Sequence, residues 1–124
     1  MQDANTLSAL IVKTLEDAKA VDVVQIDVRE LTDITENMII CHGTSDRHAS
    51  ALAQIVMKAT LAEGVRATSI EGDDTGEWVL IDYMDVLVHI MKREAREYYD
   101  IERLWDERLS KRSARKDTTI AVQG

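Results

Sequence analysis

Apolar residues recur at helical spacing in three stretches of the chain. The first covers residues 6–18, where Asn5 or Asp3 is available as N-cap, and the second covers roughly 46–62, between a glycine-threonine-serine turn and a glycine. The third runs over about 92–109. The expected inner positions are Leu7, Leu10, Ile11, Leu15 and Ala18 in the first helix, Leu52, Ile55, Val56 and Ala59 in the second, and Ala95, Tyr98, Glu102, Trp105 and Leu109 in the third, widened by Tyr99, Ile101 and Leu104.

Five shorter stretches have the patterns of β-strands. Alternation over residues 24–28 is typical of a half-buried strand, and the apolar run 37–42 is typical of a buried one. Three more strands are expected near 66–70, 77–82 and 85–91. The element order is therefore α-β-β-α-β-β-β-α, which predicts a single α/β domain.

Only Tyr83 and Met84 separate the last two strands, which predicts a hairpin with a two-residue loop. In that register Trp78 lies opposite His89. Alternation then gathers on one face the aliphatic side chains expected to meet the helices, which are Val79, Ile81, Val86, Val88 and Ile90.

The other face of this hairpin has a mixed composition. It carries Trp78, Leu80, Asp82, Asp85, Leu87, His89 and Met91. An aromatic and several aliphatics beside carboxylates and an imidazole are typical of a surface that binds another protein. Three helices are few to cover both sides of five strands, so we expect this face to be partly open. The alternative is that a terminal helix packs there and Trp78 belongs to the core.

Composition narrows the class of protein. A chain of 124 residues, 45% of them hydrophobic, fits one domain. No apolar run is long enough for a membrane span, and the first residues lack the features of a signal peptide, so we expect a soluble, cytoplasmic protein. The only cysteine, Cys41, ends an apolar run and is expected to be buried.

Charge is distributed unevenly along the chain. The net charge of −8 argues against a general nucleic-acid binder. Residues 1–107 carry 10 lysines and arginines against 22 carboxylates, whereas residues 108–124 carry 5 against 1. We therefore expect a domain over 1–109 and a flexible, basic to polar tail over 110–124. Within the tail, Lys111, Arg112, Arg115 and Lys116 are candidates for a few contacts with RNA phosphates, or for a merely solvated segment.

Several groupings suggest chemistry, but none predicts an enzyme or a metal site. Asp82, Asp85 and His89 are too far apart along the hairpin to share one ion. Ser45 lacks the glycine elbow of a hydrolase, and no phosphate-binding glycine loop is present. The residues His42, Asp46 and His48 flank the glycine turn, where they serve either an anion site or, more simply, helix capping and the surface. We expect no catalytic residue, cofactor or metal.

A set of short motifs together resembles the Iojap/RsfS ribosomal silencing factors over about residues 5–107. The motifs are Asp27-Val28-Arg29, Thr35, Met38-Ile39-Ile40-Cys41, Gly43-Thr44-Ser45-Asp46-Arg47-His48, Glu71-Gly72, Trp78-Val79-Leu80-Ile81-Asp82-Tyr83, Asp85-Val86-Leu87-Val88-His89 and Arg96-Glu97-Tyr98-Tyr99-Asp100-Ile101-Glu102-Arg103-Leu104-Trp105. The resemblance implies a mixed five-stranded sheet, distantly like a nucleotidyltransferase core without its catalytic carboxylates. Met84 departs from the pattern, because the family usually has glycine there.

The resemblance also implies a function. Family members bind the large ribosomal subunit through its ribosomal protein fourteen, block subunit association and so repress translation, with a suggested role in late assembly of the large subunit. The family's partner surface corresponds here to the mixed hairpin face, with Trp78 as its anchor. Two alternatives stay open, a small nucleotidyltransferase-like enzyme and a dimerisation or scaffold module.

Overall fold

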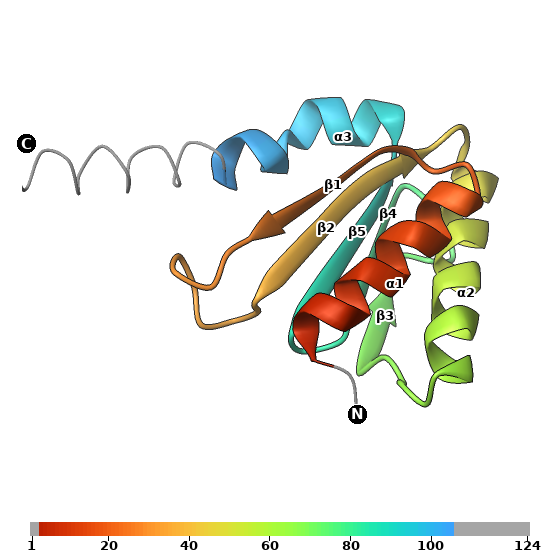
Figure 1. Ribbon diagram of the computed structural model, residues 1–124. Coiled ribbons are helices and arrows are strands. Elements are labelled where there is room, and N and C mark those ends of the chain that lie inside the picture. The colour runs from red at the N-terminus through yellow and green to blue at the C-terminus, as the bar shows by residue number, and fades with distance from the viewer. Residues whose placement is uncertain (1–2, 106–124) are drawn as a thin grey trace, which may run out of the picture.

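Three helices and five strands follow one another in the computed structural model, which describes residues 3–105 (Figure 1). The order α-β-β-α-β-β-β-α is the one predicted from the sequence. The helices are α1 (Ala4–Asp17), α2 (Asp46–Ala62) and α3 (Arg93–Tyr99), and the strands are β1 (Val21–Asp27), β2 (Asn37–Gly43), β3 (Ser69–Glu71), β4 (Trp78–Asp82) and β5 (Val86–Lys92). Among the described residues, no helix has the length and apolar character needed to cross a membrane.

The strands form one mixed sheet in the order β1-β2-β5-β4-β3. The central pair, β2 and β5, is parallel, and the remaining neighbours are antiparallel. The α2 helix lies between β2 and β3 along the chain, so β2 and β5 are joined by a long crossover rather than a tight turn. The predicted α/β class with a mixed five-stranded sheet is confirmed.

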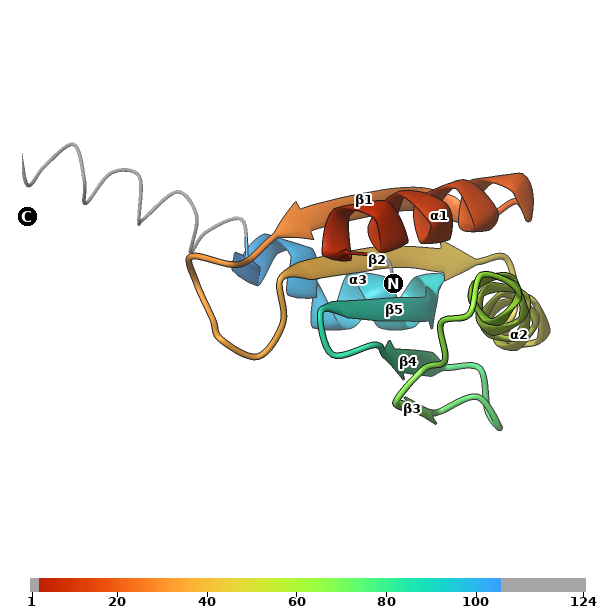
Figure 2. The same ribbon diagram turned by 60° about the horizontal axis from the view of Figure 1, so that its bottom comes forward.

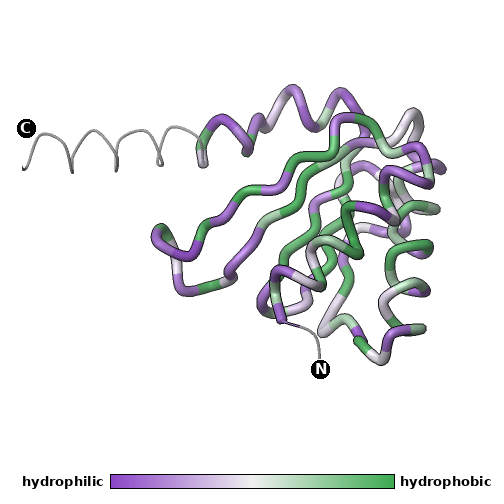
Figure 3. Tube along the Cα trace, in the orientation of Figure 1, coloured by the Kyte–Doolittle hydropathy of each residue, from purple (hydrophilic) through white to green (hydrophobic). Residues whose placement is uncertain are grey.

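Helices cover the two faces of the sheet unequally. Figure 2 shows α1 and α2 on one side and α3 on the other. The larger cluster lies under α1 and α2 and includes the five aliphatic hairpin residues predicted for the core, all fully buried. The buried residues of the smaller cluster, on the α3 side, are Ile26, Val28, Met38, Ile40, Met91 and Ala95. Because α3 is hydrophilic along nearly all of its length (Figure 3), it closes this second face only in part.

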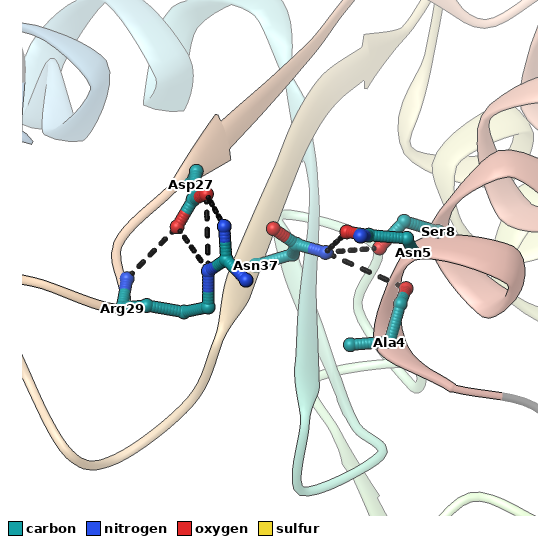
Figure 4. A network of polar contacts seen from close by, with 6 residues as sticks. All are labelled: Ala4, Asn5, Ser8, Asp27, Arg29 and Asn37. Carbon is teal, nitrogen blue, oxygen red and sulfur yellow. Dashed lines mark hydrogen bonds and ion pairs between the residues drawn. The ribbon is translucent and has the colours of Figure 1, made fainter.

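Polar contacts hold the N-terminal turns of α1 against the start of β2, an inner strand of the sheet. Asp3 caps the helix by accepting a hydrogen bond from the Thr6 amide at 2.8 Å. At the start of β2, the buried Asn37 side chain donates to Ser8 Oγ at 2.9 Å, and Figure 4 shows it directed at the first turn of α1. The helix is therefore fixed at its N-terminus by specific hydrogen bonds as well as by apolar packing.

The predicted register of the hairpin is wrong by two residues. The structure pairs Trp78 with Met91 and Leu80 with His89, instead of Trp78 with His89. The two-residue loop is formed one position later than expected, since the Tyr83 amide donates to the Val86 carbonyl at 2.9 Å and so extends the ladder. A shift of two residues preserves the sorting of side chains between the faces, because strand alternation has period two.

Three smaller expectations are also corrected. The third helix is not continuous to Leu109: α3 ends before Asp100, which has a left-handed conformation with φ of 48°, and helical turns resume over 101–105. Ile55, predicted on the inner side of α2, is 43% exposed, and the buried residues of this helix are Ala49, Leu52, Ala53, Val56 and Thr60. The third strand begins at Ser69, later than expected.

Candidate functional site: an aromatic ladder on the partly open sheet face

Four aromatic rings run from the sheet out to solvent on the α3 side. The Trp78 indole Nε1 donates to His89 Nδ1 at 3.0 Å, and the Trp78 ring lies 4.6 Å from that of Tyr99, centroid to centroid. Tyr99 contacts Tyr98 edge-to-face at 5.0 Å. Exposure rises along this series from 8% for His89, through the half-buried Trp78, to 82% for Tyr98. We call these four residues the aromatic ladder.

His89 is the buried end of the ladder. It lies on β5 between Leu80 of β4 and Ile40 of β2, neither of which has a polar side chain. Burial lowers the pKa of His89 to about 4, so the ring is neutral at physiological pH. Because Nδ1 accepts the bond from Trp78, the ring proton resides on Nε2. Within the described residues Nε2 is buried and has no hydrogen-bond partner.

The other predicted partner-binding residues are at different depths. Leu80, Leu87 and Asp82 are half-buried, and Asp85 is exposed in the hairpin turn. Met91 is fully buried, so a partner cannot touch it unless this face opens. Thus α3 covers one end of the mixed face while the other end stays accessible, so the face is partly open and partly covered by a helix.

The two aspartates of the hairpin make different contacts, Asp82 through its carboxylate and Asp85 through its backbone carbonyl. Asp82 Oδ1 accepts a hydrogen bond from the Met84 amide at 2.7 Å, and the Asp85 carbonyl oxygen accepts from the Glu36 and Asn37 amides. Among residues 3–105, no group of three or more histidines, cysteines and carboxylates is placed to hold a metal ion. The alternative of a metal at these side chains receives no support from the geometry.

The glycine turn before α2 has a structural role, since its residues cap α2 and contact the end of α1. Ser45 is the N-cap of α2 and accepts from the His48 amide at 3.0 Å, as the capping interpretation predicts. The His48 ring accepts from the Thr44 amide through Nδ1 and bonds to the Ala18 carbonyl through Nε2, which ties this turn to the end of α1. Both ring nitrogens are therefore engaged, and Ser45 is not aligned with the imidazole as a nucleophile would be.

Burial also removes Cys41 from the list of reactive groups. The side chain is fully buried, as predicted, and burial raises the pKa of its thiol to about 12. The thiolate, which is the nucleophilic form, is therefore absent at physiological pH.

Sequence reasoning missed the residue that holds α3 in place. Arg96, 7% exposed, donates from Nη1 to His42 Nδ1 at 2.8 Å and to the Val21 carbonyl at 3.1 Å, and from Nε to Glu102 at 2.6 Å. These contacts lie at the base of an open depression of about 720 Å³ between β1 and α3. Two of its three partners, Val21 and His42, come from distant parts of the chain, so the local pattern around Arg96 contains no signal for them.

The aromatic ladder was also only half visible in the sequence. Trp78 and His89 were singled out, but Tyr98 was assigned to the inner side of the third helix and is 82% exposed. An aromatic pair at positions 98 and 99 of an otherwise charged helix is the signal that could have found the outer half.

Comparisons with known proteins agree over most of the chain. The sequence profile of a family described as "Ribosomal silencing factor during starvation" matches residues 1–123. Proteins named "Ribosomal silencing factor RsfS" are similar in Chromobacterium violaceum, at 42% identity over 99 residues (80% of this chain and 81% of that protein), and in Haemophilus influenzae, at 41% over 99 residues (80% and 97%). A mouse protein named "Mitochondrial assembly of ribosomal large subunit protein 1" is 31% identical over 99 residues, 77% of this chain and 43% of that protein.

Solved structures have the same fold. A crystal structure of a Chromobacterium violaceum protein superposes with a TM-score of 0.82 at 40% identity, covering 85% of this chain and 88% of that one. A second, from Bacillus halodurans, gives a TM-score of 0.74 at 34% identity and covers 82% of this chain and 94% of that one.

Proposed function

The chain belongs to the RsfS family of ribosomal silencing factors, and from this membership we propose that it binds the large ribosomal subunit through ribosomal protein fourteen and sterically blocks joining of the small subunit. Membership itself gives the chain a ribosome-associated role in translation. The finer proposal makes the protein a cytoplasmic, non-enzymatic repressor of translation whose partner surface is the aromatic ladder with Leu80, Leu87 and the hairpin carboxylates. A further part in late assembly of the large subunit belongs to the same proposal.

The observation that carries the proposal is the half-buried position of Trp78. Its ring is held on one side by His89 and on the other by Tyr99, so it is ordered before any partner arrives. An ordered, partly exposed tryptophan in an apolar surround is the usual anchor of a protein interface, and little conformational entropy is lost when it binds.

Charge supports a basic protein as the partner. Residues 1–107 carry 22 carboxylates against 10 lysines and arginines, a net charge of −12. Asp82 and Asp85 lie beside Leu87 at the accessible end of the face. Such a rim favours lysines and arginines of a ribosomal protein and repels bare RNA, and it contributes steering and register more than net affinity.

Co-sedimentation with isolated ribosomal subunits tests the proposal. We expect the protein to bind large subunits, to bind small subunits weakly or not at all, and to reduce formation of coupled ribosomes. Trp78→Ala should weaken large-subunit binding by roughly 30-fold, the effect of losing about 2 kcal/mol at an interface anchor. Circular dichroism checks that this variant is folded.

Leu61→Ala is the matched control. Leu61 is 50% exposed on α2, on the opposite side of the sheet, so this truncation should leave binding unchanged. Equal weakening by both variants, or equal binding to both subunits, contradicts the proposed surface. A stable dimer of the purified protein that Trp78→Ala dissociates, without ribosome binding, would favour the scaffold alternative.

A further inference from the structure

Among the described residues, one buried hydrogen-bond donor, Nε2 of His89, has no acceptor. His89 is 8% exposed, and its Nε2 has no hydrogen-bond partner among them. A buried N–H left unpaired is destabilising, because it loses its hydrogen bonds to water on folding and gains none. The bond from Trp78 explains an acceptor at Nδ1, but it leaves the unpaired N–H of Nε2 without an explanation among the described contacts.

The position of this donor indicates what can reach it. The Trp78 indole engages the inner nitrogen, Nδ1, which leaves Nε2, the nitrogen farther from the backbone, as the free donor of the ring. His89 shares its face with the half-buried Leu80 and Leu87, on the side where α3 covers the sheet only in part. The donor therefore lies just beneath the surface assigned above to the ribosomal partner.

We propose that His89 is the polar specificity residue of this surface, and that its Nε2–H donates a hydrogen bond to a backbone carbonyl oxygen of the ribosomal protein that seats against Trp78. The inference rests on the proposed function and deepens it. In the free protein Nε2 is buried, so the bond forms when the side chains over it move aside as the partner binds, while Trp78 keeps its bond to Nδ1.

A neutral carbonyl fits the site better than an anion. The imidazole is neutral, since burial depresses its pKa, and it offers a single N–H rather than a charge. The charged side chains of this face and of α3 include two ion pairs, Arg93–Glu97 and Arg96–Glu102, with Asp82 and Glu94 as further acidic groups. This mainly acidic surround disfavours a phosphate or a carboxylate at Nε2.

Two substitutions of His89 separate the effect of its hydrogen-bond donor on binding from the effect of its side-chain volume. His89→Leu removes the donor and keeps an apolar volume. His89→Gln keeps an oxygen that can accept from Trp78 and an amide that can donate outward. We expect the leucine variant to unfold in urea near the wild-type midpoint, because removing the unpaired Nε2–H offsets the lost bond from Trp78. It should bind large subunits about tenfold more weakly, since a partner carbonyl is then buried unpaired. The glutamine variant should bind within about threefold of the wild type.

The outcomes test the donor role of His89 separately from the proposed binding to the large subunit. If the wild type binds large subunits and Trp78→Ala weakens binding, but His89→Leu binds as the wild type does, the inference alone is wrong. If the glutamine and leucine variants are both folded and lose affinity equally, the donor role is also wrong. Absence of wild-type binding overturns the proposed function itself. His89→Met serves as a second apolar variant should the leucine variant fail to fold.

Discussion

Met84 illustrates how one backbone angle constrains the choice of residue. It lies in the two-residue loop between β4 and β5 with φ of 73°, and its amide is held at 2.7 Å by the Asp82 carboxylate. A side chain in the left-handed region costs roughly 1–2 kcal/mol relative to the right-handed one, whereas glycine adopts it freely. The conformation therefore favours glycine at this position, and the methionine adopts it with strain.

Replacing Met84 tests that reading. We expect Met84→Gly to raise the free energy of unfolding by about 0.5–1 kcal/mol, because the relief of strain exceeds the added entropy of the unfolded chain. Met84→Val should lower it by about 1 kcal/mol, since a branched side chain fits positive φ worst. Met84 is 64% exposed, so loss of packing is small. Urea unfolding measures the change in the free energy of unfolding for both variants. A change of the same sign in the two would contradict the assignment of backbone strain to Met84.

At the scale of elements, the hairpin of β4 and β5 shows which features follow from local sequence and which depend on tertiary contacts. The sequence predicted both strands, the two-residue loop and the division of side chains between faces, because these depend on local alternation. It misplaced the loop by one residue, because Tyr83 continues the hydrogen-bond ladder beyond the end of β4 for a tertiary reason. The Tyr83 hydroxyl lies 2.8 Å from Thr60 Oγ1 of α2, and its ring is buried under that helix. No local pattern contains that contact.

The predicted length of the last helix was also wrong, again because of tertiary contacts. Periodicity predicted one helix over 92–109, but the chain turns at Asp100 and resumes helical turns that bring Ile101 and Trp105 to the smaller cluster. Arg96 joins the two parts through Glu102, and both to β1 and β2. The position of α3, and hence how much of the ladder is covered, depends on this buried arginine.

Arg96→Met is therefore expected to lower the free energy of unfolding by about 2 kcal/mol, because it removes three hydrogen bonds and leaves Glu102 uncompensated. Urea unfolding measures the loss, and a double-mutant cycle with Glu102→Gln isolates the pair. The matched control is Arg93→Met on the same helix. Arg93 and Glu97 are 72% and 66% exposed, so losing this pair should cost less than about 0.5 kcal/mol. Equal losses at the two arginines would show that burial does not govern these contacts.

At the scale of the whole molecule, two regions of opposite charge suit two kinds of ribosomal surface. The acidic part, residues 1–107, fits a basic protein, whereas residues 108–124 carry a net charge of +4. The predicted tail, 110–124, lies outside the described residues, as do its candidate RNA contacts Lys111, Arg112, Arg115 and Lys116. We propose that these four side chains provide a second, weaker attachment to ribosomal RNA while the sheet face holds the ribosomal protein.

Salt dependence separates the two attachments. Each phosphate contact releases condensed cations from RNA, so the affinity falls with salt by a slope of roughly 0.7–0.9 per contact on a logarithmic plot. Truncation after Leu109 should therefore weaken binding to large subunits most at low salt and flatten the slope by about two to four such contacts. A full-length variant with serine at the four basic positions is the control, because it keeps the length of the tail and should flatten the slope equally. The salt dependence that remains after truncation comes from the contacts of the domain. We expect Arg66→Ser to leave it unchanged, because Arg66 is a basic residue on the α2 side of the molecule, away from the proposed partner surface. An unchanged slope in the truncated protein would leave the tail without a role in RNA binding and the sheet face as the whole of the attachment.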